Sequence, residues 1–70
     1  MSSIEFVDLG AVTVEHVTEK AALITLHSTG EKTWMPLGQM ATPTRSAVEE
    51  GTRDFDLFRV SEWIAGAKDL

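Results

Sequence analysis

The stretch that decides the fold runs from Val12 to Leu26 and reads Val-Thr-Val-Glu-His-Val-Thr-Glu-Lys-Ala-Ala-Leu-Ile-Thr-Leu. Apolar and polar side chains alternate along most of it, and β-branched residues are frequent, which is typical of strands that bury one face. The polar segment Thr18–Lys20 interrupts the alternation. The stretch therefore predicts an antiparallel hairpin with strands at about 11–18 and 21–27.

The register of this hairpin follows from the requirement that apolar residues of neighbouring strands share a face. A three-residue loop at Thr18–Lys20 meets that requirement, whereas a two-residue loop would mix the faces. The predicted pairs are Val12 with Leu26, Val14 with Ile24 and His16 with Ala22 on one face, and Thr13 with Thr25 and Glu15 with Leu23 on the other.

Outward from the hairpin, the same alternation predicts further strands at about 4–9, 31–36 and 55–60. Thr29-Gly30 is expected to form a two-residue loop before the strand at 31–36, because glycine accepts a positive φ there. This loop places Met35 beside Ile24 on the aliphatic face. On the opposite face it places Trp34 beside Thr25, Lys32 beside His27, and Pro36 beside Leu23.

The remaining segments predict little regular structure except at the end of the chain. Leu37–Met40 is expected to form a single helical turn. Residues 42–54 are expected to form a polar loop, because the capping-box pattern at Ser46–Glu49 is not followed by an apolar helix. Ser61 is a favourable N-cap for a helix over 61–68, in which Trp63 is expected to anchor the helix to the strands.

These elements predict an all-β domain with one C-terminal helix, in the form of a small five-stranded SH3-like barrel spanning residues 1–70. The alternatives are an OB-like barrel and a bent sheet under the helix. A chain of 70 residues has room for one hydrophobic core only.

Composition narrows the classes of function. The chain has no cysteine, which excludes disulfides and thiolate metal sites and favours a reducing cytoplasm. Its longest apolar run, Ala21–Ile24, is far shorter than a membrane span, so no membrane association is expected. With 6 basic and 11 acidic residues the net charge is -5, which disfavours nucleic acid as a partner.

Catalytic and metal-binding patterns are not recognisable in the sequence. It contains no nucleophile motif, phosphate-binding loop or paired-carboxylate pattern, so we expect no enzyme, no catalytic residues and no cofactor. The predicted register puts His16 and His27 on opposite faces of the hairpin, which argues against a metal site.

Two surfaces are candidates for binding a partner. A large aromatic residue that points away from the aliphatic face, as Trp34 does here, usually has a function. The alternative is that the terminal helix or a second copy of the chain covers Trp34. The second surface is the acidic part of the polar loop, for which the alternative is an ordinary solvated segment. The candidate residues are Trp34, Leu23, Thr25, His27 and Lys32 on the first surface, and Glu49 and Glu50 on the second.

Three stretches stand out: Thr18–Leu26, the motif Trp34-x-Pro36-x-x-Gln39, and the expected helix with Glu62-Trp63-Ile64-Ala65. In these stretches the chain resembles a group of small uncharacterised phage and prophage proteins. This chain has Leu37-Gly38 where those proteins more often have Lys-Ser, which removes a basic residue near Trp34. The resemblance implies a phage or mobile-element accessory protein that acts in the bacterial host cytoplasm.

The expected function is therefore that of a non-catalytic accessory protein that binds a host protein or protein complex. The target would belong to nucleic-acid-handling or defence machinery, which the protein would inhibit, as an anti-CRISPR protein does. One alternative is a single-stranded nucleic-acid-binding accessory protein, in which an aromatic side chain stacks on bases. The other is a structural phage protein that forms a homo-oligomer.

Overall fold

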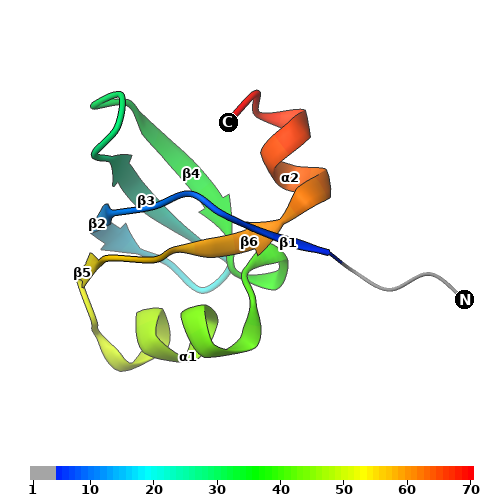
Figure 1. Ribbon diagram of the computed structural model, residues 1–70. Coiled ribbons are helices and arrows are strands. Elements are labelled where there is room, and N and C mark those ends of the chain that lie inside the picture. Colours follow the sequence, from blue (N-terminus) through cyan, green and yellow to red (C-terminus); the bar gives the residue numbers. More distant parts are fainter. Residues whose placement is uncertain (1–4) are drawn as a thin grey trace, which may run out of the picture.

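The structure is a computed structural model that describes residues 5–70, and it consists mainly of β-strands with a helix near the C-terminus, as predicted (Figure 1). Residue 4, where the first strand was expected to begin, lies outside the described residues. The elements are β1 Phe6–Asp8, β2 Val12–Val17, β3 Ala21–Leu26, β4 Lys32–Pro36, the 3-10 turn η1 Leu37–Gln39, α1 Thr42–Glu50, β5 Asp54–Phe55, β6 Arg59–Ser61 and α2 Glu62–Ala67.

The strands form two antiparallel sheets rather than the predicted closed barrel. One has four strands in the order β4-β3-β2-β5, and the other pairs β1 with β6. The single strand expected at 55–60 is divided, because the chain pairs with β2 at Asp54–Phe55 and then crosses to β1 at Arg59–Ser61. Between these pairings Phe58 turns fully into the core. The segment therefore links two sheets and does not close one barrel.

The hydrophobic core lies on one side of the four-stranded sheet, which we call the inner face. Both helices and the β1–β6 ribbon lie on this side of the sheet (Figure 1). The residues predicted for the aliphatic face, Val12, Val14, Ile24, Leu26 and Met35, are all buried, as expected. The core is completed by Ala22, Leu37, Met40, Val48, Phe58, Val60, Ile64 and Ala65.

A β-bulge in β2 changes the predicted register at one end of the first hairpin. Val12, Thr13 and Val14 pair with Leu26, Thr25 and Ile24 as predicted. Beyond the bulge, His16 pairs with Leu23 and Val17 with Ala22, so the predicted pairs His16–Ala22 and Glu15–Leu23 are wrong. Because the bulge adds one residue to β2, the apolar Val17 pairs with Ala22, where the polar His16 was predicted.

The β3–β4 hairpin has the predicted faces but a register shifted by two residues. Its loop comprises residues 27–30 instead of Thr29-Gly30 alone, with the Gly30 amide donating to the Leu26 carbonyl at 2.6 Å and Gly30 at φ 78. The predicted pairings of Met35 with Ile24, Trp34 with Thr25, Lys32 with His27 and Pro36 with Leu23 are therefore wrong. A shift of two residues keeps every side chain on its face, because the period of a strand is two. The observed pairs are Leu23 with Trp34, Thr25 with Lys32 and Ala21 with Pro36.

The prediction of a polar loop at 42–54 is wrong for the first part of that segment, because Thr42–Glu50 forms the helix α1. Pro43 lies in the first turn, and Gly51 ends the helix in the left-handed conformation at φ 103. The Gly51 amide donates to Val48 at 3.1 Å and the Thr52 amide to Ala47 at 2.9 Å, which is a Schellman cap. Thr44 and Val48, one turn apart, are the residues the helix buries against the core.

Ser61 is the N-cap of the terminal helix α2, as predicted, but Trp63 does not anchor the helix. The Ser61 hydroxyl accepts from the Ile64 amide at 3.2 Å and donates to the Gln39 side chain at 2.6 Å. Ile64 and Ala65 are buried, whereas Trp63 is 69% exposed. No helix among residues 5–70 has the length and apolar character needed to cross a bilayer.

Candidate functional site

The outer face of the four-stranded sheet, opposite the core, carries the residues singled out from the sequence. Because both helices and the β1–β6 ribbon pack on the inner face, the side chains on the outer face are half-buried or exposed. We call this surface the Trp34 face. Its members are Thr13, Glu15, His16, Leu23, Thr25, His27, Lys32, Trp34 and Asp54.

A row of apolar and aromatic side chains crosses three strands of the Trp34 face. The backbone pairs His16 with Leu23 and Leu23 with Trp34, so the three residues lie side by side on β2, β3 and β4. The rings of His16 and Trp34 meet edge to face, with centroids 6.1 Å apart and planes at 86°. Leu23 is half-buried and Trp34 remains 45% exposed. The row is an ordered apolar patch open to solvent.

A second, polar row lies beside it and is held by side-chain hydrogen bonds. The Thr25 hydroxyl donates to the Glu15 carboxylate at 2.8 Å. The Thr13 hydroxyl lies 2.6 Å from His27 Nε2 and 3.3 Å from Asp54 Oδ1. Since a hydroxyl has a single proton, His27 Nε2 must be the donor whenever Thr13 donates to Asp54. These bonds fix the side chains next to the aromatic row.

The bulge in β2 is stabilised from the neighbouring segment that leads into β5. The Val14 amide donates to the Arg53 carbonyl at 2.6 Å. The Arg53 guanidinium in turn lies 3.4 Å from the carbonyls of Val14 and Glu15. These contacts give hydrogen-bond partners to backbone groups of Val14 and Glu15 at the position of the bulge. They hold Glu15 and His16 in place on the outer face.

The structure brings together the partner-binding residues predicted around Trp34, and it places the two predicted glutamates on a different part of the molecule. Trp34, Leu23, Thr25, His27 and Lys32 share the Trp34 face, and α2 does not cover it. Glu49 and Glu50 are exposed in the last turn of α1, which packs on the inner face. Glu49 also lies 3.5 Å from Arg45 of the same helix.

Two members of the Trp34 face, His16 and Asp54, were not placed on it from the sequence. The signal for His16 was the spacing of Val12, Val14 and Val17, which changes from two to three and so requires an extra residue in the strand. Asp54 comes from a strand of two residues that carries no local signal.

The charges on the Trp34 face are mixed, with the carboxylates of Glu15 and Asp54 and the ammonium group of Lys32. His16 and His27 both lie on this face rather than on opposite faces, which corrects the sequence prediction. Among residues 5–70 no group of three or more His, Cys, Asp or Glu side chains is arranged to hold a metal ion. The arrangement can make apolar, aromatic and hydrogen-bonding contacts with another molecule.

Comparisons of the chain with protein-family models, with curated proteins and with solved structures find no match. Its function therefore has to be argued from its own residues.

Proposed function

We propose that the chain is a non-catalytic protein-binding module that engages its partner through the Trp34 face. In keeping with the sequence resemblance, the partner would be a bacterial host complex that handles nucleic acid or takes part in defence, and the module would act as its inhibitor in the host cytoplasm.

One observation carries the proposal: Trp34, on the edge strand β4 of an ordered sheet face, is 45% exposed and contacts the His16 ring. Exposed tryptophan is costly to hydrate, and binding energy at protein interfaces concentrates in a few aromatic residues that become buried. The half-buried Leu23 beside it extends the apolar centre. Glu15, Thr25 and Lys32 supply a polar rim, which is the usual composition of a protein interface.

The charges favour a protein over nucleic acid as the partner. Lys32 is the cation of the Trp34 face, and it is accompanied by the carboxylates of Glu15 and Asp54. Affinity for a nucleic acid backbone depends on several lysine or arginine residues that displace counterions. The net charge of -5 opposes such binding further.

The test is capture of a partner from a bacterial lysate with three forms of the immobilised protein. Trp34→Ala should lose the proteins that the unsubstituted chain retains, because a truncated tryptophan hot spot commonly costs about 2 kcal/mol or more. Trp63→Ala is the matched control, since it removes an equally large and 69% exposed side chain from α2. The Trp63→Ala variant should still retain the captured proteins. Captured candidates are then purified and tested for direct binding.

A circular dichroism melt of each variant separates loss of binding from loss of fold. We expect both to melt cooperatively near the unsubstituted protein. Full retention of partners by a folded Trp34→Ala variant would eliminate the Trp34 face. Two further measurements address the alternatives: tryptophan fluorescence titrated with single-stranded DNA, and the molar mass in solution. Stacking of DNA on Trp34, or a homo-oligomer that buries it, would replace the proposal.

A further inference from the structure

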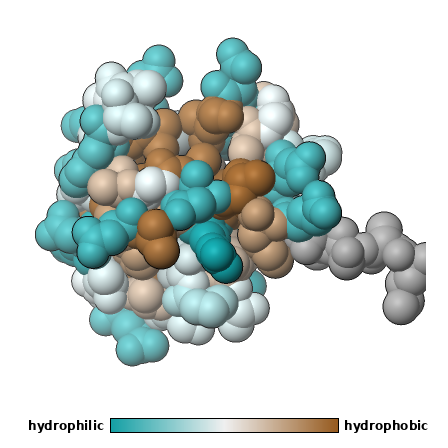
Figure 2. All heavy atoms as spheres, viewed as in Figure 1, coloured by the Kyte–Doolittle hydropathy of each residue, from teal (hydrophilic) through white to brown (hydrophobic). Residues whose placement is uncertain are grey.

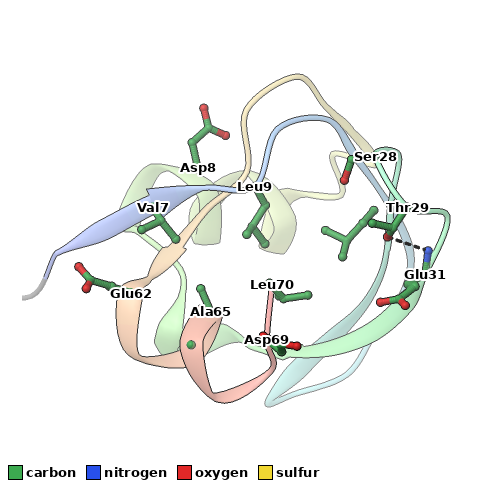
Figure 3. A pocket seen from close by; sticks show the side chains of 12 residues that line it. Val7, Asp8, Leu9, Ser28, Thr29, Glu31, Glu62, Ala65, Asp69 and Leu70 are labelled. Atoms are coloured by element: carbon green, nitrogen blue, oxygen red, sulfur yellow. Dashed lines mark hydrogen bonds between the residues drawn. The ribbon is translucent and has the colours of Figure 1, made fainter.

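A pocket of about 550 Å³ opens on the inner side of the sheet, away from the Trp34 face (Figure 3). It lies between β1, the loop that joins β3 to β4, and the C-terminal end of α2. Figure 2 shows hydrophobic residues gathered near the centre and upper part of this side of the molecule, with hydrophilic residues around them. Side chains of Val7, Leu9, Leu26, Ala65 and Leu70 supply the apolar part of the lining.

The charged residues that line this pocket all have the same sign. They are Asp8, Glu31, Glu62 and Asp69, and no lysine or arginine of residues 5–70 joins them. Figure 3 shows Glu31 and Asp69 on the side of the loop and the end of α2, whereas the carboxylates of Asp8 and Glu62 lie near β1 and point outward at the rim. Carboxylates placed around a low-dielectric hollow reinforce one another's field and attract cations.

The charge of Glu62 is already poorly compensated in the free protein. Protonated Glu62 donates a hydrogen bond to the neighbouring Glu5 side chain, and the negative charge of Glu5 disfavours ionisation of Glu62, so both effects raise the pKa of Glu62 above its ordinary value. A positive group brought to this side of the pocket would offset that repulsion. The electrostatics therefore favour a ligand that is both cationic and apolar.

We propose that this pocket binds a short basic segment of a partner protein, in which a lysine or arginine lies next to an aliphatic residue. The aliphatic side chain would contact Leu9, Leu26 and Leu70, and the cationic group would lie near the carboxylates of Glu31 and Asp69. A volume of about 550 Å³ is larger than one side chain and falls within the range of about 300–1,000 Å³ of ordinary ligand sites. Long basic side chains suit such a lining, because they lay an apolar stem on apolar surface and keep the charge at its edge.

The proposal does not depend on the Trp34 face. It is tested by titrating ¹⁵N-labelled protein with blocked Arg-Leu-Arg and Gln-Leu-Gln peptides of the same length. We expect saturable shifts of the Leu9, Leu26 and Gly66 amides with the basic peptide, and affinity at least about tenfold weaker for the neutral one, equivalent to about 1.4 kcal/mol. The indole signal of Trp34 should not move. Added salt should weaken the binding.

Two variants connect the binding to the pocket. Gly66 lines it and has open space where a Cβ would be, so Gly66→Leu should reduce the pocket volume and the peptide affinity while leaving the fold intact. Gly38→Leu is the matched control, because a Cβ there also meets nothing within 4 Å and Gly38 is outside the pocket. Glu31→Gln should weaken binding of the basic peptide selectively.

The proposal would be overturned by equal affinity for the two peptides, by unchanged affinity in Gly66→Leu, or by the absence of any saturable shift at millimolar peptide. Shifts confined to the Trp34 face would also overturn it, and they would leave the proposed function standing.

Discussion

Ile24 lies at the centre of the inner face, fully buried between Val14 on β2 and Thr33 on β4. Replacement by alanine removes its γ and δ carbons, and at about 0.8 kcal/mol per buried methylene the transfer term alone is roughly 2–3 kcal/mol. The residual cavity adds to this, which gives about 3–5 kcal/mol in total. At about 0.05–0.15 kcal/mol per residue, the total free energy of unfolding of a domain of this size is roughly 3.5–10 kcal/mol. Ile24→Ala should therefore leave the domain close to its unfolding threshold.

The assay is urea denaturation followed by circular dichroism, with the free energy of unfolding taken from the linear dependence on denaturant. Leu23→Ala is the matched control, because Leu23 is the adjacent residue of β3 on the half-buried outer face. Leu23→Ala should lower the free energy of unfolding by no more than about half as much as Ile24→Ala does. A loss of less than about 1 kcal/mol for Ile24→Ala, or a larger loss for Leu23→Ala, would refute the assignment of the inner and outer faces.

Three further predictions concern the helices. Gly51→Ala should lower the free energy of unfolding by about 1–2 kcal/mol in urea titrations, because alanine is strained at the left-handed φ of 103 that ends α1. A neutral outcome would contradict the Schellman cap. Glu50→Lys should raise the stability by about 0.3–1 kcal/mol at low salt, since it replaces a negative charge in the last turn of α1 by a positive one, and the gain should shrink in high salt. Because Glu5 raises the pKa of Glu62, the folded state binds the proton of the Glu62 carboxyl more tightly than the unfolded state does. The free energy of unfolding therefore falls progressively as the pH rises above the ordinary pKa of glutamate and Glu62 loses this proton. The melting temperature of Glu62→Gln should therefore increase relative to the unsubstituted protein between about pH 4 and pH 7, and a difference that is constant with pH would show that the two carboxyl groups do not interact.

The first hairpin was predictable because its information is local. Val12, Val14, Ile24 and Leu26 must share a buried face, and the period of two then fixes which residues point outward. The same rule put Trp34 on the correct face even though the assumed loop was too short. The bulge was missed because alternation was extended through His16, although Val17 lies three positions after Val14 and signals the extra residue.

The helices were harder to predict because tertiary contacts decide them. α1 is polar along most of its length, and burial of Val48 against the sheet is a contact that no local pattern shows. Pro43 and Gly51, at the two ends, were its detectable signals. The N-cap Ser61 and, in α2, Ile64 and Ala65 face inward, whereas the larger Trp63 faces solvent. The pocket draws on three separate segments and had no signal in the sequence.

The central claim is that a partner binds the Trp34 face, and the two tryptophans of the chain allow a direct measurement. Each gives one indole N–H signal in a ¹⁵N-correlated spectrum, and Trp34 and Trp63 lie on different elements, β4 and α2. We predict that titration with the captured partner shifts or broadens the Trp34 indole signal and leaves that of Trp63 unchanged. A partner that binds at saturation while the Trp34 signal stays in place would contradict the account.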